Sequence, residues 1–309
     1  MTEFITSWPD HAPKNAWLTI GNFDGVHLGH QSLIQGLREK AKEQEGQSLV
    51  LTFWPHPRVV LGQVGDRFLL TTRQEKERQL KIAGIDLVLT LPFEKNLADL
   101  SAGAFLERLI GSLRPAGLLV GPKFRLGKDR QADFAFIQNF CESKGISCKC
   151  FPPYLLGDDI VSSNRIRACL IEGQVGEAAR LLGRSFSLEG VIQPGKQIGR
   201  KLGFPTANFY PEPLQLLPRF GVYATRVLLD DQVLMGVTNV GVRPTFESTS
   251  SPNVETLILD FDDKIYYETM RIEFMEFLRP ERRFGQVEEL IAQIEDDEAQ
   301  TRRIFQNEP

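Results

Sequence analysis

Short apolar runs alternate with amphipathic patterns over residues 16–185. The apolar runs have the length of buried strands, and the segments between them repeat apolar side chains at helical spacing. Strands alternating with helices of this length predict a doubly wound, Rossmann-like α/β fold with a parallel sheet. The predicted strands are Leu18–Gly21, Leu49–Phe53, Asp86–Leu91, Gly117–Gly121 and Ser147–Phe151. The predicted helices are one bearing Leu33, Ile34, Leu37 and Ala41 on one face, then Arg73–Ala83, Ala102–Ile110, Phe134–Lys144, Arg165–Glu172 and Val175–Leu182.

The pattern changes near residues 183–185. From Phe186 onward the apolar runs are separated by turns and read as strands. Short strands in series with one closing helix, Val287–Phe305, predict a small antiparallel β-barrel. We therefore expect two domains, residues 1–183 and 184–309. The strands predicted in the second are Ser187–Ile192, Val222–Leu229, Val233–Val240, Val254–Phe261 and Met270–Met275.

The composition of the 309 residues, 42% hydrophobic and 25% charged, is ordinary for a folded protein. The 36 basic and 40 acidic side chains give no basic excess, so we expect neither nucleic acid nor an anionic membrane as partner. No apolar run approaches the roughly 18 residues of a membrane helix, and the first residues lack the pattern of a secretory signal. The four cysteines follow no common zinc spacing, and we expect reduced thiols in a cytoplasmic enzyme.

Glycines and histidines follow directly after the first predicted strand, in Gly21-Asn22-Phe23-Asp24-Gly25-Val26-His27-Leu28-Gly29-His30. Histidines three positions apart at a helix start can point the same way. Helix N-termini attract phosphate, glycines let a nucleotide approach the backbone, and imidazole donors can stabilise charge developing on phosphorus. The alternative is a glycine turn with locally bonded histidines. The position after the first strand of a doubly wound sheet, where ligands bind, favours the nucleotide site.

Two more segments fall at the same expected edge of the sheet. Residues 52–58, with His56, Pro57 and Arg58, follow the second strand. Residues 161–167 precede a helix that Ser162 or Ser163 can cap, and there Arg165 and Arg167 can meet phosphates. Either segment alone fits an ordinary cap or surface arginine equally well. Together with residues 27–30, they resemble the nucleotidyltransferase superfamily and its histidine-x-glycine-histidine signature, which implies direct in-line nucleotidyl transfer with release of pyrophosphate.

Glycines recur every four residues, with basic side chains between them, in Gly195-Lys196-Gln197-Ile198-Gly199-Arg200-Lys201-Leu202-Gly203. A loop of this kind suits polyphosphate, which backbone donors cradle and cations neutralise. A plain flexible turn is the alternative. Just beyond the loop, Thr206 and Asn208 offer neutral oxygens for a phosphate-bound magnesium ion, a hard cation that prefers oxygen ligands.

The segment ending Pro205-Thr206-Ala207-Asn208 resembles a motif of riboflavin kinases, and residues 220–224, 236–246 and 278–284 match the same family in order and spacing. With the first half, the whole chain resembles the bacterial bifunctional riboflavin kinase/FAD synthetase family. The resemblance implies that riboflavin and ATP give FMN and ADP in the barrel. FMN and a second ATP then give FAD and pyrophosphate in the N-terminal domain, with Mg²⁺ bound mainly through ATP oxygens.

The resemblance also assigns roles to residues. Glu255 would activate the ribityl 5′-hydroxyl; a carboxylate is costly to bury in an apolar strand without a purpose, although alternation can place it on the solvated face instead. His27 and His30 would stabilise the adenylyl transition state, and Thr206 and Asn208 would also hold the metal. The expected flavin contacts are His56, Pro57, Arg58, Arg279 and Glu281. The expected ATP or phosphate contacts are Gly21, Phe23, Gly25, Gly29, Ser163, Arg165, Arg167, Gly195, Lys196, Gly199, Gly203, Thr206 and Asn208.

The chain departs from the family pattern at Lys123, which replaces an acid or amide, and at Asn164, Leu257 and Tyr267, which replace threonine, histidine and glycine. A lysine can meet a phosphate but cannot accept a hydrogen bond from a nucleotide hydroxyl. Three alternatives therefore stay open. They are a kinase with weak or lost adenylyltransferase activity, a flavin-binding protein without catalysis, and a nucleotidyltransferase acting on another phosphate-bearing substrate.

Overall fold

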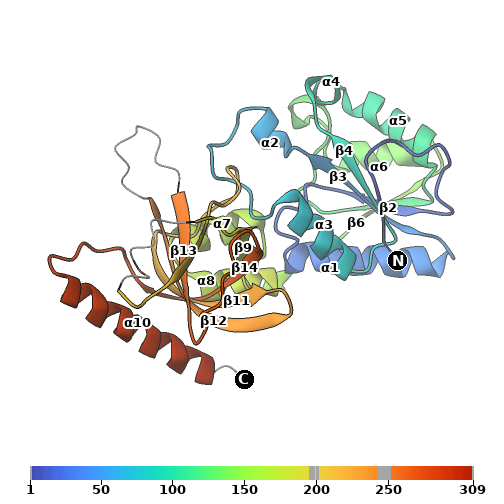
Figure 1. Ribbon diagram of the computed structural model, residues 1–309. Helices are drawn as coiled ribbons and strands as arrows, with labels where there is room; N and C mark the ends of the chain where they lie inside the picture. Colours follow the sequence, from blue (N-terminus) through green and yellow to red (C-terminus); the bar gives the residue numbers. More distant parts are fainter. Residues whose placement is uncertain (1, 195–198, 200–201, 243–251, 308–309) are drawn as a thin grey trace. The chain divides into compact units, whose positions relative to one another are not determined.

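The computed structural model describes residues 2–194, 199, 202–242 and 252–307 (Figure 1). The chain forms two compact units, Met1–Ser163 and Asn164–Pro309. Their junction falls at the start of helix α7 (Ser163–Ile171), so α7 and α8 (Val175–Leu182) belong with the second unit. The expected boundary between two functional domains, at residues 183 and 184, stays a prediction.

Six parallel strands form the sheet of the first unit, in the order β1-β4-β3-β2-β5-β6. This arrangement confirms the predicted doubly wound sheet and its five apolar strands. The sequence pattern missed β1, a three-residue edge strand whose side chains are largely exposed. The strands are β1 (Glu3–Ile5), β2 (Trp17–Ile20), β3 (Ser48–Trp54), β4 (Leu87–Pro92), β5 (Gly117–Val120) and β6 (Ser147–Cys150).

Helices cover both faces of this sheet because successive strand residues point to opposite sides. Val50 packs with Leu37 of α1 (Leu28–Glu43) and with Leu80 of α3 (Arg73–Ile82). Leu51 packs in the other layer, which contains Leu109 of α5 (Ala102–Leu113) and residues of α6 (Phe134–Ser143). The remaining short elements are α2 (Pro57–Val60), α4 (Lys95–Ala98) and the hairpin of β7 (Leu155–Leu156) and β8 (Asp159–Ile160).

The strand order reverses between β2 and β5, which are neighbours. From β2 the chain proceeds to β3 and β4 on one side, and then crosses to β5 on the other. Open α/β sheets bind ligands outside the carboxyl ends of their strands at such a point. The segment that contains His27 and His30 follows β2, and Lys123 follows β5, so both lie at the reversal.

The second unit is an antiparallel sheet in the order β10-β13-β12-β11-β14-β9. Its two outer edges meet at a bridge between Gln193 and Asn208, so the sheet closes as the predicted barrel. The short strand β10, which carries Thr206 and Asn208, was not among the predicted strands. The strands are β9 (Ser187–Val191), β10 (Thr206–Phe209), β11 (Gly221–Leu229), β12 (Gln232–Val242), β13 (Pro252–Ile258) and β14 (Thr269–Arg279), followed by α10 (Val287–Gln306).

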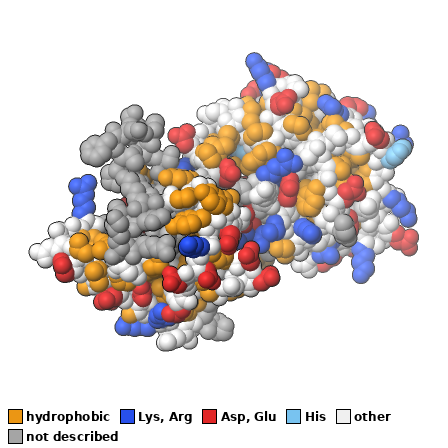
Figure 2. Space-filling model, viewed as in Figure 1, with side chains coloured by type: hydrophobic (Ala, Val, Ile, Leu, Met, Phe, Trp, Pro, Cys, Tyr) orange, Lys and Arg blue, Asp and Glu red, His pale blue; other side chains and the backbone are white. Residues whose placement is uncertain are grey.

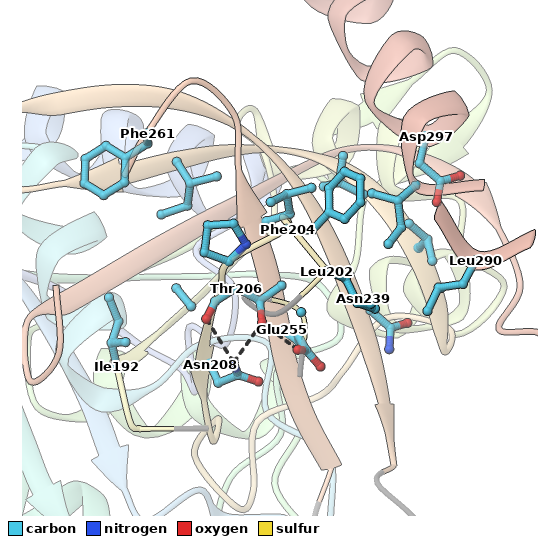
Figure 3. A pocket seen from close by; sticks show the side chains of 18 of the residues that line it. Ile192, Leu202, Phe204, Thr206, Asn208, Asn239, Glu255, Phe261, Leu290 and Asp297 are labelled. Atoms are coloured by element: carbon cyan, nitrogen blue, oxygen red, sulfur yellow. Dashed lines mark hydrogen bonds between the residues drawn. The ribbon is translucent and has the colours of Figure 1, made fainter. Parts of the chain in front are cut away.

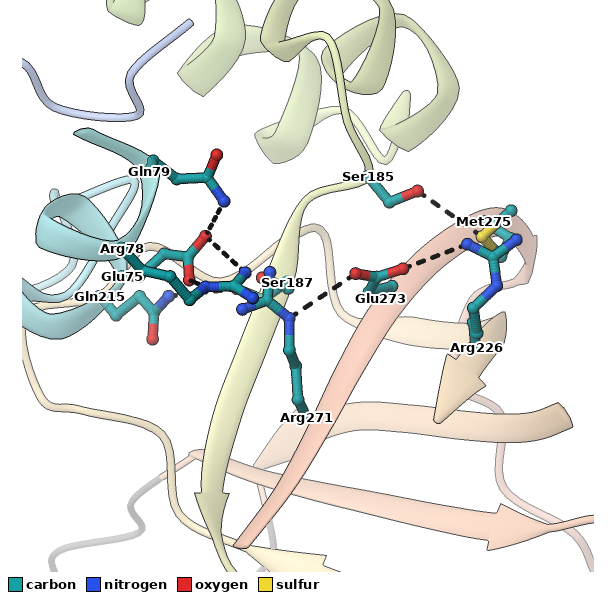
Figure 4. A network of polar contacts seen from close by, with 10 residues as sticks. All are labelled: Glu75, Arg78, Gln79, Ser185, Ser187, Gln215, Arg226, Arg271, Glu273 and Met275. Carbon is teal, nitrogen blue, oxygen red and sulfur yellow. Dashed lines mark hydrogen bonds and ion pairs between the residues drawn. The ribbon is translucent and has the colours of Figure 1, made fainter. Parts of the chain in front are cut away.

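Polar contacts link neighbouring strands of the barrel (Figure 4). Glu273 of β14 pairs with Arg226 of β11 at 3.2 Å and with Arg271 at 3.6 Å. Gln215 donates to the carbonyl of Ser187 at 3.2 Å and so fastens the segment before β11 to β9. The contacts of Glu273 with Arg226 and of Gln215 with Ser187 stabilise the pairing of neighbouring segments of the barrel wall.

Charges of both signs are interspersed on the face drawn in Figure 2, in line with the near balance of acidic and basic residues. In the described part of the chain, no helix is long and apolar enough to cross a membrane.

Candidate active sites

The first candidate site lies at the N-terminus of α1. His27 is the N-cap of this helix, and its Nδ1 accepts a hydrogen bond from the backbone N–H of His30 at 3.3 Å. Because Nδ1 is an acceptor, the proton of the neutral His27 ring is on Nε2. The two imidazole rings stack, with centroids 3.7 Å apart and planes inclined by 15°. The structure therefore brings His27 and His30 together, as the sequence predicted.

His30 is held in its neutral form. Its pKa lies well below the ordinary value, chiefly because burial disfavours the charged ring and also because His27 and Lys76 add positive charge. The Nδ1 atom of His30 is buried and has no hydrogen-bond partner among the described residues. A neutral imidazole donates one N–H, so at neutral pH His30 can act on a phosphate as a hydrogen-bond donor.

Three residues of the loop before α1 have positive φ values, and hydrogen bonds to a buried carboxylate hold the loop in place. Phe23, Gly25 and Val26 have φ values of 49°, 86° and 38°, in the left-handed region. The buried carboxylate of Asp24 holds this loop by accepting hydrogen bonds from the backbone N–H groups of Leu70 at 3.0 Å and Thr71 at 3.2 Å. Such strain persists only where the surroundings enforce it, and it is concentrated at functional sites.

Local packing also favours glycine at two of the predicted phosphate-loop positions. A Cβ at Gly21 would lie 3.0 Å from the ring of Phe23, and one at Gly29 would lie 3.2 Å from the ring of His27. The turn interpretation and the nucleotide interpretation of these glycines are thus compatible. The same absence of a side chain that admits the local rings leaves backbone available to a ligand.

The predicted segment around Ser163 lies against this loop. The hydroxyl of Ser163 donates to the carbonyl of Asp24 at 2.9 Å, and the carbonyl of Val161 faces Gly29. Arg165 and Arg167 follow on α7 within the second unit, where they contact Glu177 and Asn164, each at 2.9 Å. The phosphate contacts of these two arginines stay predictions.

His56, Pro57 and Arg58 form the start of α2 after β3. His56 is buried and caps the helix, because its Nδ1 accepts from the backbone N–H of Arg58 at 3.1 Å. The ring of Phe68 packs edge-on against His56, and the guanidinium of Arg58 lies over the same ring at 4.9 Å. This places an aromatic and a cation beside the carboxyl end of β3.

Sequence reasoning missed Lys76 of α3, whose ammonium group is buried at the ends of β2 and β3. It donates to Thr52 Oγ1 at 3.2 Å, to the carbonyl of Phe53 at 3.1 Å and to that of Asn22 at 3.4 Å. Burial lowers its pKa to about 8, although nearby Asp24 acts in the opposite direction. The only sequence signal was its position four residues before the buried Leu80, on the face of α3 that meets the sheet.

The second candidate site is a pocket of about 540 Å³ in the second unit, lined by residues of β10, β12, β13 and α10 (Figure 3). Glu255 of β13 faces this pocket, so the alternation of the strand does not direct it to bulk solvent. Thr206 Oγ1 donates to Glu255 Oε1 at 2.6 Å. Asn208, paired with Glu255 across the two strands, donates through Nδ2 to Thr206 Oγ1 at 3.3 Å. The three predicted residues thus form one hydrogen-bonded group.

Apolar side chains line the rest of the pocket. Val222, Val237 and Leu257 are buried there, and Phe204 and Ile294 pack against them. Leu257, at the position where the family often has histidine, therefore extends the apolar wall on the same strand as Glu255. A pocket with apolar walls and a small polar group suits a flat, largely apolar ring system that carries a polar chain.

Arg279 and Glu281 both line this pocket, each held by a partner. The guanidinium of Arg279 makes a bidentate pair with the buried carboxylate of Asp297 on α10, with Nε–Oδ1 and Nη2–Oδ2 distances of 2.9 and 2.8 Å. Glu281 Oε1 accepts from Asn239 Nδ2 at 3.1 Å. Sequence reasoning missed Asp297, since nothing in the helix pattern distinguishes it from the neighbouring acidic residues.

The glycine-rich loop is only partly described. Gly195 and Lys196, and the motif residues 243–246, lie outside the described residues. The carbonyl of Gly199 accepts from the backbone N–H groups of Leu202 at 3.0 Å and Phe204 at 2.9 Å, and Gly203 has φ +91°. The end of this loop therefore turns directly into β10 and leads to Thr206.

Two departures from the family pattern have clear structural settings. Lys123 is exposed after β5. Tyr267 has φ +72°, in the left-handed region that favours the glycine of the family pattern, and its side chain is largely exposed.

The potential cation ligands in the barrel site are oxygen atoms. Within the described ranges, no group of three or more histidine, cysteine, aspartate or glutamate side chains is arranged to hold a metal ion. Thr206 Oγ1 and Asn208 Oδ1 are neutral oxygens beside Glu255, and this donor set fits Mg²⁺, which is commonly bound by few protein ligands together with substrate phosphates and water.

Comparisons with known proteins assign both halves. Residues 10–165 match the family model for FAD synthetase, and residues 182–305 match that for riboflavin kinase. The chain is 33% identical to the bifunctional riboflavin kinase/FMN adenylyltransferase of Listeria monocytogenes, over 94% of this chain and 93% of the relative. It is 37% identical to the protein of the same description from Pseudomonas fluorescens, over 96% and 94%. A crystal structure described as a macrolide-efflux protein from Streptococcus pneumoniae is similar in fold, with a TM-score of 0.88 and 28% identity over 97% of this chain and 98% of that one.

Proposed function

The chain belongs to the bifunctional riboflavin kinase/FMN adenylyltransferase family, and on this premise we propose which of its residues perform the two reactions. It phosphorylates riboflavin to FMN with ATP, and it adenylylates FMN to FAD with release of pyrophosphate. Family membership thus excludes the alternatives of a binding protein and of a different phosphate-bearing substrate. The residue roles below are proposals.

In the kinase reaction, Glu255 is the general base. The ribityl 5′-hydroxyl attacks the γ-phosphorus of ATP, its proton passes to the Glu255 carboxylate, and ADP leaves. A primary hydroxyl is a poor nucleophile until a base is placed on its proton. The observation that carries this proposal is the hydrogen bond from Thr206 to Glu255 at the wall of a pocket otherwise lined by apolar side chains.

Thr206 and Asn208 would hold Mg²⁺ that enters with ATP. When bound, the ion would neutralise part of the negative charge of the ATP phosphates. The glycine-rich segment, including Gly195, Lys196, Gly199 and Gly203, would lie along the phosphates. Support comes from the turn at Gly199–Phe204, which delivers the chain from that segment to Thr206.

In the adenylyl transfer reaction, an FMN phosphate oxygen attacks the α-phosphorus of ATP, and pyrophosphate leaves. N–H groups of His27 and His30 would donate to the oxygens that gain negative charge. The stacked rings at the N-terminus of α1, next to the glycines at 21, 25 and 29 and to Phe23, support this role. We also retain Ser163, Arg165 and Arg167 as phosphate ligands, on the strength of their motif.

Flavin contacts are proposed on both halves. Arg279 and Glu281 line the kinase pocket, where a flavin ring would meet the apolar wall. His56, Pro57 and Arg58 would contact FMN in the adenylyltransferase. We propose residues 1–183 as the adenylyltransferase domain and 184–309 as the kinase domain. Because both reactions consume ATP, a cytoplasmic location is proposed as well.

One assay tests the proposal. The chain is incubated with riboflavin, ATP and Mg²⁺, and the flavins are separated by chromatography. We expect FAD from the whole chain and FMN alone from a fragment of residues 184–309. A soluble, folded fragment that leaves riboflavin unchanged would contradict the placement of a complete kinase in the barrel.

A further inference from the structure

Asn253 extends the polar group of the kinase site by one residue. It lies two positions before Glu255 on β13, so both side chains point to the same side of the strand. Its side chain is buried, with 4% of the residue exposed, and its Nδ2 donates to Asn208 Oδ1 at 3.2 Å. Asn253 is absent from the described lining of the pocket, so it stands behind the residues that face a substrate.

The hydrogen bonds from Asn253 to Glu255 run in one direction. Asn253 donates to Asn208 at 3.2 Å, Asn208 donates to Thr206 at 3.3 Å, and Thr206 donates to Glu255 at 2.6 Å. Figure 3 shows the last two of these steps beside the pocket. Hydrogen bonds arranged head to tail polarise one another and become stronger together.

The direction follows from the chemistry of the carboxylate. Ionised Glu255 can only accept, so the single hydroxyl proton of Thr206 must point to it. Thr206 Oγ1 is then left to accept from Asn208, which turns the amide nitrogen of Asn208 toward Thr206 and its oxygen toward position 253. That position therefore requires a donor, which Asn253 supplies.

The second polar atom of the Asn253 amide, Oδ1, makes no bond to a described residue that would fix the orientation of the amide. Asn253 Oδ1 is buried and has no hydrogen-bond partner among the described residues. Reversing the amide of Asn253 would direct its oxygen at the oxygen of Asn208, two acceptors without a proton between them. The orientation with Nδ2 toward Asn208 is thus the one that satisfies the group as a whole.

We propose that Asn253 is a positioning residue for riboflavin phosphorylation, which fixes the amide of Asn208 so that the Thr206 proton is committed to Glu255. Asn208 Nδ2 also donates to the backbone carbonyl of Thr206 at 3.2 Å, so the amide of Asn208 is held at both ends, its nitrogen by Thr206 and its oxygen by Asn253. Without a donor at 253, the oxygen end loses its partner, and the amide holds the Thr206 proton toward Glu255 and its own oxygen toward Mg²⁺ less firmly. This inference rests on the proposed role of Glu255 as the base.

Two substitutions of similar size separate the donor from the packing. Asn253→Asp keeps the shape of the side chain but replaces the amide donor by a carboxylate acceptor, which repels the oxygen of Asn208. Asn253→Leu removes the donor and the acceptor of the amide and introduces no such repulsion. We expect kcat for riboflavin phosphorylation to fall by roughly 10–100-fold in Asn253→Asp, as for loss of outer partners that orient ligands. The fall in Asn253→Leu should be smaller, and KM for riboflavin should stay near the wild-type value in both variants.

A pH series supplies a readout that a packing role would not move. A protonated carboxyl has an O–H and can donate, so the kcat of Asn253→Asp divided by that of the wild type should rise as pH falls from 8 to 5.5. Taking the ratio cancels the titration that both proteins share.

Folding is monitored separately in every variant. Adenylylation of supplied FMN should be unchanged, and quenching of riboflavin fluorescence should report that the pocket still binds. Wild-type kcat in Asn253→Asp, or equal losses in both variants with a flat ratio, would overturn the positioning role. If Glu255→Gln itself kept full kinase activity, the proposed base would fail instead, so the two failures are distinguishable.

Discussion

The imidazole rings of His27 and His30 stack with their centroids 3.7 Å apart and their planes inclined by 15°. Two cationic rings would repel each other at this separation. Burial, His27 and the ammonium group of Lys76 all lower the pKa of His30, so the pair carries at most one charge at neutral pH. The site is therefore built to donate hydrogen bonds to a nucleotide while keeping His30 neutral.

Replacement of His30 by alanine should depress adenylylation of FMN. Loss of one donor to a developing oxyanion lowers the rate by roughly 10²–10³-fold. FMN formation from riboflavin, measured in the same preparation, should not change. His11→Ala is the matched control, because His11 is exposed and lies outside the site. Unchanged FAD formation in His30→Ala would remove His30 from the mechanism.

Lys76 should make the unfolding free energy of the first unit depend on pH in the alkaline range. Its pKa falls from the ordinary 10.5 to about 8 on folding, so between these values the unfolded chain binds more protons than the native one. The unfolding free energy, relative to Lys76→Met, should therefore rise with pH across this window by up to about 3 kcal/mol, and this gain is lost as pH falls back from 10.5 to 8.

Tryptophan fluorescence measures this effect selectively, because Trp8, Trp17 and Trp54 are the chain's three tryptophans and all belong to the first unit. Denaturant titrations at pH 7, 8, 9 and 10 give the difference between wild type and variant. Lys81→Met, at an exposed position on the same helix, is the control and should show no such trend. A difference independent of pH would show that the ammonium group titrates as it does in water.

The contrast between His30 and Lys76 illustrates what the sequence could predict. His27 and His30 were predictable because they are local: a strand, a glycine turn and a helix start lie within a few residues. Lys76 reaches the same region through the packing of α3 against two strand ends, and helical periodicity alone suggests an apolar side chain there. The apolar strands of both halves were predictable for a similar reason, since their burial pattern is continuous along the chain.

Lys123→Asn should accelerate FAD formation without altering FMN formation. An exposed ammonium group after β5 can attract ATP, but it cannot orient the group that an asparagine or aspartate would contact. Uniform binding does not raise turnover, so FMN should accumulate before FAD in a wild-type time course. Slower adenylylation in the variant would instead show that Lys123 has a phosphate-binding role of its own.

Tyr267→Gly should stabilise the barrel. The residue has φ +72°, a conformation that disfavours side chains, and 72% of it is exposed, so little packing is lost. Relief of left-handed strain, less the added entropy of the unfolded chain, gives a gain of up to about 1 kcal/mol. Thermal unfolding followed by circular dichroism measures it, and kinase activity should persist. Tyr210→Gly, at an exposed position outside the left-handed region, should destabilise; equal effects of both changes would contradict the strain argument.

Residues behind the kinase site could not be predicted from the sequence because they depend on strand pairing. Whether Glu255 faced the pocket or solvent was open until the register of β13 was known. Asn253 acquires its role only because β10 places Asn208 opposite Glu255. Asp297 meets Arg279 across 18 positions through the packing of α10, a contact that no local pattern encodes.

The division of the two reactions between two sites is tested most directly by Glu255→Gln, which keeps shape but removes the base. The flavins formed by this variant are separated by chromatography after incubation with ATP and Mg²⁺, starting once from riboflavin and once from FMN. FMN formation should fall by roughly 10²–10⁴-fold, while conversion of supplied FMN to FAD should proceed at the wild-type rate. FMN formation at the wild-type rate, or equal loss of both reactions in a folded protein, would contradict the account.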